Sequence, residues 1–157
     1  MDAAWRVLYR VAHRGLRAWW FLRRPELRGA HVAVWHGEEL LLIRTSYRRE
    51  DCVPSGYIEP GEEPVEAARR ELAEEVGISA TTDALVATQE FELRHYSARN
   101  RTFFWELRLA ERPPLEIDRR EIVWAGFVAA RDLPSRNLVP ELRRYLELQG
   151  AARGPSH

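Results

Sequence analysis

The stretch GYIEPGEEPVEAARRELAEEVGI, from Gly56 to Ile78, decides the fold of this chain. Pro64 suits the first turn of a helix, because it lacks an N–H that would go unsatisfied there and its φ angle is preset. Gly77 suits the residue after the helix, which is often left-handed. The stretch therefore predicts a helix over residues 64–76. Its apolar residues recur at helical spacing on one face, which we expect to pack on a sheet: Val65, Ala68, Leu72 and Val76.

The same helix carries three glutamates on one patch of its surface. Glu71 and Glu75 are one turn apart, and Glu74 lies beside them. Like charges one turn apart destabilise a helix by roughly a few tenths of a kcal/mol per pair, and a divalent cation would reverse that effect. Mg²⁺ prefers oxygen ligands and keeps positions for water and substrate phosphate. The alternative is a solvated acidic face that pairs with Arg69 and Arg70.

Nine residues of the stretch follow the spacing G-x5-E-x7-R-E-U-x-E-E-x-G-U, in which U is aliphatic. A chance match at a given start is on the order of one in 10^9. The stretch resembles the Nudix box of the MutT-like hydrolases, although that family more often has two or three adjacent glycines where this chain has Gly56 alone. The resemblance implies an α/β fold in which a Nudix-type mixed β-sheet is sandwiched between helices. It also implies an enzyme that acts on acid anhydrides in phosphorus-containing compounds. Such an enzyme cleaves a diphosphate linkage in a nucleoside diphosphate joined to another group, with Mg²⁺ or Mn²⁺ as cofactor.

The resemblance also implies roles for residues of the box. Arg70 is expected to orient a glutamate in support of catalysis. The implied metal ligands are three carboxylates, a backbone carbonyl near the box glycine and one further acidic residue in or beyond the first shell: Glu71, Glu74, Glu75, Gly56 and Glu62. The general base stays open between Glu71 and Glu121, which precedes a predicted strand. Other acidic residues are less favoured for that role: Glu92, Glu106, Glu116 and Asp118.

Four residues near the box are candidates for binding the substrate. Arg44 and Arg48 precede the box loop and are predicted to meet phosphates, with a solvated loop edge as the alternative. Tyr57 and Tyr96 are predicted to stack on a base. Tyr96 loosely resembles the tyrosine found downstream of the box in diadenosine polyphosphate hydrolases. The identity of the substrate stays open.

Composition narrows the class of protein. The chain has 157 residues, a formal net charge of zero and arginine at all 24 of its basic positions. At zero net charge no global field selects nucleic acid as a partner of this single domain, and the partner that the resemblance implies is a small-molecule nucleotide-type diphosphate. The only cysteine, Cys52, excludes an internal disulfide and is expected to be buried. Without a recognisable secretory signal or an apolar run of membrane-spanning length, the expected location is cytoplasmic.

The N-terminal region predicts a basic amphipathic helix over residues 3–24. Its aromatic stripe is expected to pack on its own domain or in a homodimer, or to contact a membrane surface. The expected division is residues 1–28 for this helix and its connector, 29–149 for the hydrolase domain and 150–157 for a disordered tail. The helix is also the hint for one alternative function, hydrolysis of a prenyl or other lipid diphosphate. A non-catalytic Nudix-like ligand-binding module is a second alternative, although such modules usually lack box glutamates and none is missing here.

Hydrophobic patterning predicts the remaining elements. Residues 30–35 and 39–44 are expected to form a hairpin that turns at 36–38, with residues 40–43 covered on both faces. A long strand is expected within 80–95, a turn at 96–101, strands at 102–109 and 122–128, and a helix at 139–149. Strands with so few intervening helices favour a mixed α/β sandwich.

Overall fold

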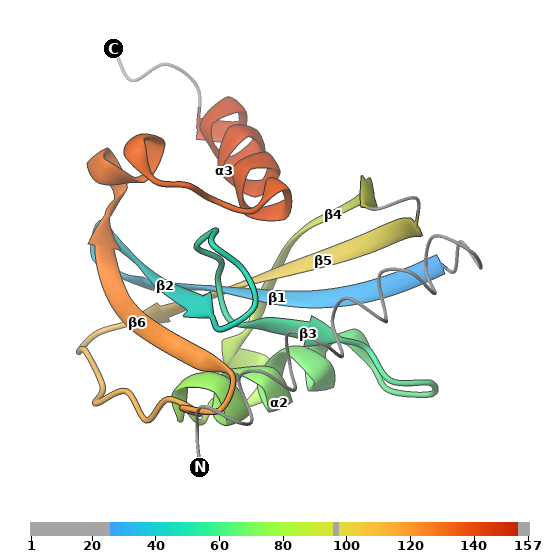
Figure 1. The fold of residues 1–157 in the computed structure, drawn as a ribbon, viewed down its shortest axis with the longest axis horizontal. Helices are drawn as coiled ribbons and strands as arrows, with labels where there is room; N and C mark the ends of the chain where they lie inside the picture. The colour runs from blue at the N-terminus through green and yellow to red at the C-terminus, as the bar shows by residue number, and fades with distance from the viewer. Residues whose placement is uncertain (1–25, 96–97, 154–157) are drawn as a thin grey trace.

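The structure is a computed structural model that describes residues 26–95 and 98–153. The predicted helix over residues 3–24 and the tyrosine at position 96 lie outside these residues. Six strands form one mixed sheet, and Figure 1 shows α2 below the sheet and α3 above it, so the predicted sandwich is confirmed. The elements follow in this order: β1 (Glu26–His36), β2 (Glu39–Thr45), β3 (Ser55–Tyr57), α2 (Pro64–Val76), η1 (Thr82–Ala84), β4 (Val86–His95), β5 (Ala98–Leu109), β6 (Ile122–Ala129), η2 (Ala130–Ser135) and α3 (Pro140–Arg153).

Strand β1 organises the sheet, whose order is β4-β5-β1-β2-β6. One edge of β1 pairs in parallel with β5 along its whole length. Its other edge is shared, because β2 pairs with it at Trp35 and His36, whereas β3 pairs with it from Gly29 to His31. The chain between β2 and β3 therefore leaves the sheet beside the middle of β1. This departure positions the cavity described below.

Most predicted elements are confirmed, with different boundaries. The hairpin of β1 and β2 and the helix over residues 64–76 form as expected. Strand β1 is longer than the 30–35 prediction because it begins at Glu26, where it already pairs with β5. The turn predicted at 96–101 is wrong over its second half, since β5 begins at Ala98 and residues 98–101 pair with β4. Strand β3 and the two 3-10 helices were not predicted from the sequence.

The core lies on both sides of the sheet. Leu40 to Ile43 are fully buried, as a strand covered on both faces requires, and the Cys52 thiol is buried as expected. Above the sheet, Tyr145 of α3 stacks on Phe104 of β5 with their ring centroids 4.5 Å apart. No helix in the described part of the chain is long and apolar enough to cross a bilayer.

Candidate active site

Helix α2 is fixed to the sheet in a way that presents its glutamates toward β3. It begins at Pro64 and ends at Val76, and the next residue, Gly77, is left-handed with a φ of 73°. Ala68, Leu72 and Val76 are buried against the sheet, as the helical spacing predicts. A side chain at position 77 would also collide with Glu116, because its Cβ would lie 2.7 Å from the Cβ of Glu116. The helix end is therefore closed by backbone geometry that glycine supplies.

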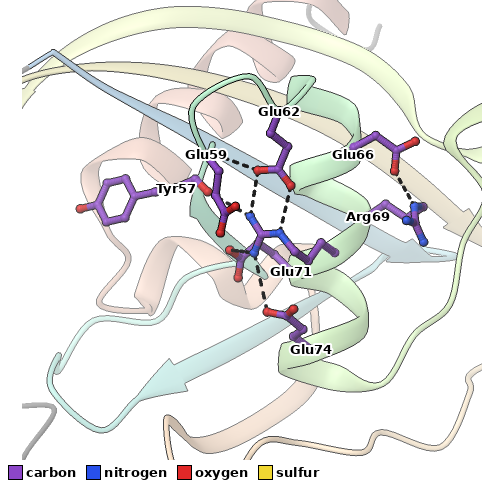
Figure 2. Close-up of polar contacts among 8 residues, drawn as sticks. Tyr57, Glu59, Glu62, Glu66, Arg69, Glu71 and Glu74 are labelled. Carbon is purple, nitrogen blue, oxygen red and sulfur yellow. Dashed lines mark hydrogen bonds and ion pairs between the residues drawn. The ribbon is translucent and has the colours of Figure 1, made fainter.

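One guanidinium ties the loop before α2 to the acidic face of the helix. Arg70 donates from Nε and Nη2 to the two carboxylate oxygens of Glu62, at 3.0 and 3.1 Å. It donates from Nη1 to Glu71 at 2.6 Å and from Nη2 to the carbonyl of Tyr57 at 3.1 Å, and Nη1 lies 3.6 Å from Glu74. Figure 2 shows these carboxylates gathered around the one guanidinium. The fork of three guanidinium nitrogens permits this shared contact, whereas a lysine would have to make it from one nitrogen.

Strand β3 brings backbone groups close to two of the glutamates. The backbone N–H of Ser55 donates to Oε2 of Glu75 at 2.8 Å. A Cβ at position 56 would collide with the Glu71 carboxylate, so only glycine leaves room for that side chain beside the strand. The glycine that opens the box motif therefore permits a close approach of Glu71 to the backbone of β3.

A cavity of about 260 Å³ opens beside these groups. It lies between β3, the start of α2's acidic face and the segment that leaves β2. Its polar lining contains two groups. Glu71, Glu75 and Glu121 act on one another electrostatically and are called the acidic end, whereas His31, Asn100 and Glu141 form the group called the other end. The lining residues that matter for the argument are Glu71, Glu75, Glu121, Arg48, Tyr57, His31, Asn100 and Glu141.

The acidic end of the cavity holds a surplus of negative charge. Burial raises the pKa of the Glu75 carboxyl well above its usual range, the Ser55 N–H opposes this shift, and the charges of Glu71, Glu121 and Glu74 add to it. Burial also raises the pKa of the Glu71 carboxyl, although its hydrogen bond and ion pair with Arg70 lower it. Desolvation and like charges both disfavour the ionised form of a carboxylate. The ionised forms of these carboxylates are therefore unfavourable without a further positive charge nearby.

The glutamates do not yet form a cage for a cation. Within residues 26–95 and 98–153, no three His, Cys, Asp or Glu side chains are already gathered as metal ligands. Arg70 holds Glu71, Glu75 faces the Ser55 N–H, and the Glu74 side chain is 61% exposed and does not line the cavity. The donor set nevertheless fits a hard divalent cation, because it consists of carboxylate oxygens in a site with excess negative charge.

Glu121 reaches this site from a distant part of the sequence. Its backbone carbonyl accepts from the Ser46 N–H at 2.7 Å, and its Oε1 accepts from the Tyr47 hydroxyl at 2.7 Å. The loop that carries it is attached to the end of α2, because the Asp118 N–H donates to the Glu75 carbonyl at 3.3 Å. Burial and the charge and hydrogen bond of Glu121 raise the pKa of the Tyr47 hydroxyl, which therefore stays protonated as a donor.

The other predicted site residues divide between the cavity and its surroundings. Arg48 and Tyr57 line the cavity. Arg44 does not line it; Nε donates to the buried carboxylate of Asp51 at 2.8 Å, and the guanidinium lies over the Trp124 ring. Glu62 is taken up by Arg70, whose hydrogen bond lowers the pKa of the Glu62 carboxyl. The less favoured base candidate Glu106 is buried against Tyr145, whose hydroxyl donates to it at 2.6 Å.

Four cavity residues whose side chains matter for the argument were not among the sequence candidates: Tyr47, His31, Asn100 and Glu141. His31 stands within the otherwise apolar run AHVAVW of β1, and a single polar residue in such a run is a pattern that could have drawn attention to it. The other three carry no such pattern. Asn100 and Glu141 meet His31 only because β1, β5 and α3 converge, whereas Tyr47 reaches the cavity from the segment after β2.

Comparisons with known proteins agree with this geometry. A family model for the NUDIX domain matches residues 25–149. An uncharacterized Nudix hydrolase, orf19 of Rhodococcus erythropolis, is 31% identical to this chain, with 72% of this chain and 76% of that protein covered.

Two solved structures share the fold. An Ap4A hydrolase of C. elegans in a binary complex has a TM-score of 0.64 at 19% identity, with 78% of this chain and 97% of that chain covered. The NUDIX domain of Shewanella oneidensis NrtR, complexed with ADP ribose, has a TM-score of 0.68 at 14% identity, with 78% and 84% covered. From the family match and the orf19 relative together, this chain belongs to the Nudix hydrolase family and is a pyrophosphohydrolase that acts on acid anhydrides in phosphorus-containing compounds.

Proposed function

We propose that this enzyme hydrolyses a diphosphate linkage in a nucleoside diphosphate joined to another moiety, and that it depends on Mg²⁺ or Mn²⁺. The observation that carries the proposal is the acidic end of the cavity, where Glu71, Glu75 and Glu121 come together with raised pKa values for the first two carboxyls. A diphosphate is itself anionic, so these carboxylates would repel it without an intervening cation.

The residues that would hold the cation are Glu71 and Glu75, with Glu74 and the carbonyl of Gly56 as further candidates. Glu62 is bound by Arg70 and is therefore proposed to act on the site indirectly. When bound, a divalent cation neutralises phosphate oxygens and lowers the pKa of a coordinated water. Release of Glu71 from its 2.6 Å contact with Arg70 is a rearrangement that we expect cation binding to require.

Other residues are proposed to position the reactants. Glu121 can accept a proton from the attacking water, because it lines the cavity and is held at Oε1 by the Tyr47 hydroxyl. Glu71 stays the alternative base. Arg70 orients Glu71 and the loop at Tyr57 without touching the substrate. Arg48 can meet a phosphate in the cavity, and Tyr57 can stack on a ring at its mouth, where 44% of Tyr57 is exposed.

Two fold neighbours support a nucleotide-type substrate. One is an Ap4A hydrolase and the other was solved with ADP ribose, and both ligands contain a nucleoside attached to a phosphate chain. Hydrolysis of a lipid diphosphate has support only from the sequence of residues 1–24, which lie outside the described residues. Helix α3 includes residues 150–153, so the disordered tail predicted at 150–157 is wrong over those residues. The division at residues 1–28 and 29–149, the membrane or homodimer contact of the first segment and the cytoplasmic location stay predictions.

The test is a panel of soluble nucleoside diphosphate compounds with a phosphate readout after phosphatase treatment. It is run with Mg²⁺, with Mn²⁺ and with EDTA, on the full chain and on a chain that lacks residues 1–24. We expect metal-dependent release of nucleoside monophosphate from at least one compound by both chains. Hydrolysis that persists unchanged in EDTA, or that is confined to a prenyl diphosphate included in the panel, would contradict the proposal.

A further inference from the structure

The end of the cavity away from the acidic cluster contains a second group of polar side chains. His31 of β1, Asn100 of β5 and Glu141 of α3 all line it. They are 9%, 9% and 4% exposed, so more than nine-tenths of each residue is buried. Burial of polar side chains on three different elements is unfavourable unless their hydrogen-bonding groups find partners.

Two polar atoms of this group have no partner within the described residues. They are Nδ1 of His31 and Oδ1 of Asn100. The amide of Asn100 is oriented, because Nδ2 donates to Oε1 of Glu141 at 3.3 Å. Its Oδ1 is therefore a buried acceptor without a donor, on a residue that lines the cavity. A buried acceptor without a donor is a place that a ligand can satisfy.

Ring stacking holds His31 in place, and a glycine lies beside the group. The His31 ring stacks on Phe104 with centroids 4.9 Å apart, and Phe104 in turn stacks on Tyr145. A Cβ built on Gly29 would lie 3.2 Å from Nε2 of His31 and 3.6 Å from Oδ1 of Asn100. Both atoms therefore converge on the space above Gly29, which has no side chain to fill it.

The group lies within reach of the acidic end. His31 pairs across the β1–β3 ladder with Ser55, whose N–H donates to Glu75. Neighbouring strands are about 4.8 Å apart. A molecule with its phosphates at the acidic end can therefore place its next chemical group against His31, Asn100 and Glu141.

We propose that His31, Asn100 and Glu141 form the specificity subsite for the non-phosphate moiety of the substrate, and that they bind an uncharged group rich in hydrogen-bond donors. The N–H edge of a nucleobase and the hydroxyls of a sugar share this chemistry. Glu141 and Oδ1 of Asn100 are hydrogen-bond acceptors. Burial is the largest cause that lowers the pKa of His31 to about 4. The ring is therefore neutral near pH 7 and offers one donor and one acceptor. This inference rests on the proposed function for the position of the phosphates.

The test measures binding rather than turnover. The full chain with Mg²⁺ is titrated by calorimetry with inorganic phosphate, ribose 5-phosphate, IMP and GMP. Two variants alter the subsite in different ways: Glu141→Gln replaces an acceptor with a group of the same shape, and Gly29→Ala fills the space between His31 and Asn100. Glu147→Gln is the matched control, because it makes the same change on the exposed side of α3.

We expect wild type to bind ribose 5-phosphate or a nucleotide at least about tenfold more tightly than phosphate, and both variants to remove most of that gain. Phosphate affinity should change less than about twofold in either variant, and the control should match wild type. A gain already present with ribose 5-phosphate assigns the subsite to sugar hydroxyls. A gain that appears only with the bases assigns it to a base edge, and preference for GMP over IMP identifies the extra amino group as a donor.

No gain over phosphate in wild type would overturn the inference. So would an equal loss of phosphate affinity in Glu141→Gln, because that result marks a structural role for Glu141. A failure of the proposed hydrolysis would appear in the activity panel and not in these titrations. The two proposals can therefore fail separately.

Discussion

The two ends of the cavity respond to burial in opposite ways. At the acidic end, burial raises the pKa values of the Glu71 and Glu75 carboxyls. At the other end, burial lowers the pKa of the His31 imidazole. Desolvation is the largest cause in all three cases, because it disfavours a charge of either sign. What differs is the neighbourhood: the carboxylates repel one another, whereas Glu141 and Arg48 act on His31 with opposite sign.

This difference assigns catalysis to the acidic end and the choice of substrate to the other end. The ionised carboxylates of the acidic end are disfavoured by burial and by one another. A bound cation would offset both effects. At the other end the His31 ring is neutral near pH 7, and its Nδ1 and the Oδ1 of Asn100 lack hydrogen-bond partners within the described residues. Neutral hydrogen-bonding groups distinguish one substrate from another more effectively than they accelerate its reaction. We therefore expect changes at the first end to alter turnover and changes at the second to alter preference.

The largest effect is expected from Glu75→Gln. This change keeps the shape of a buried side chain but removes a carboxylate that would hold the cation. Metal-dependent turnover should fall by roughly 100-fold or more, since loss of even an outer-shell partner of a metal often costs 10- to 100-fold. Steady-state hydrolysis across a series of Mg²⁺ concentrations measures it.

The matched control for that change is Glu66→Gln on the same helix. Glu66 is exposed and pairs with Arg69 rather than with the cavity, so turnover should stay within about twofold of wild type. Full activity of Glu75→Gln with an unchanged metal dependence would contradict the role of Glu75 as a ligand.

The part of the acidic end that α2 supplies was predictable from the sequence because its determinants are local. Helix α2 forms over the predicted residues, since Pro64 and Gly77 act at its two ends and the apolar spacing fixes the buried face. Two consequences were not predictable from helical spacing. First, Glu75 is buried rather than open to solvent, and it accepts from the Ser55 N–H of strand β3, which was not predicted. Second, Arg70 donates to Glu71 and lies beside Glu74.

The other end was not predicted because its determinants are distant in sequence. His31, Asn100 and Glu141 lie about 70 and 40 residues apart along the chain and meet only through the parallel pairing of β1 with β5 and the packing of α3 on Phe104. The same holds for Tyr47, which meets Glu121 across 74 residues. Local patterns specify which residues share a helix face, whereas the convergence of three elements depends on the register of the sheet.

A smaller effect is expected from Tyr47→Phe, which tests whether Glu121 is the general base. The change removes the hydroxyl that holds Oε1 of Glu121 at 2.7 Å. If Glu121 is the base, kcat should fall about tenfold with little change in KM, which is less than the 10²- to 10⁴-fold contribution of a general base itself. Tyr145→Phe is the control, because it also removes a buried hydroxyl but one that bonds Glu106 away from the cavity. Equal kcat values for Tyr47→Phe and wild type would favour Glu71 as the base.

The smallest effect is a pH dependence of stability whose sign differs between the two ends. His31 has a pKa of about 4 in the folded protein and about 6.5 in the unfolded chain. The unfolded chain therefore binds the extra proton first as pH falls, and stability present above pH 6.5 is lost toward pH 4. Between pH 7 and pH 6, wild type should lose roughly 0.7 kcal/mol of unfolding free energy relative to His31→Gln.

Glu75 should act with the opposite sign in the same urea-unfolding experiment, carried out in EDTA. Its folded pKa is raised, so its contribution to stability is present below the unfolded value and is lost as pH rises through the folded one. Glu75→Gln should accordingly stabilise the cation-free protein more at pH 7 than at pH 5, whereas Mg²⁺ should reduce that advantage by binding wild type. If wild type and both variants instead kept parallel pH profiles, burial would not be setting the charge at either end. The contrast between carboxylates that need a cation at the acidic end and an uncharged His31 ring at the other end would then lose its physical basis.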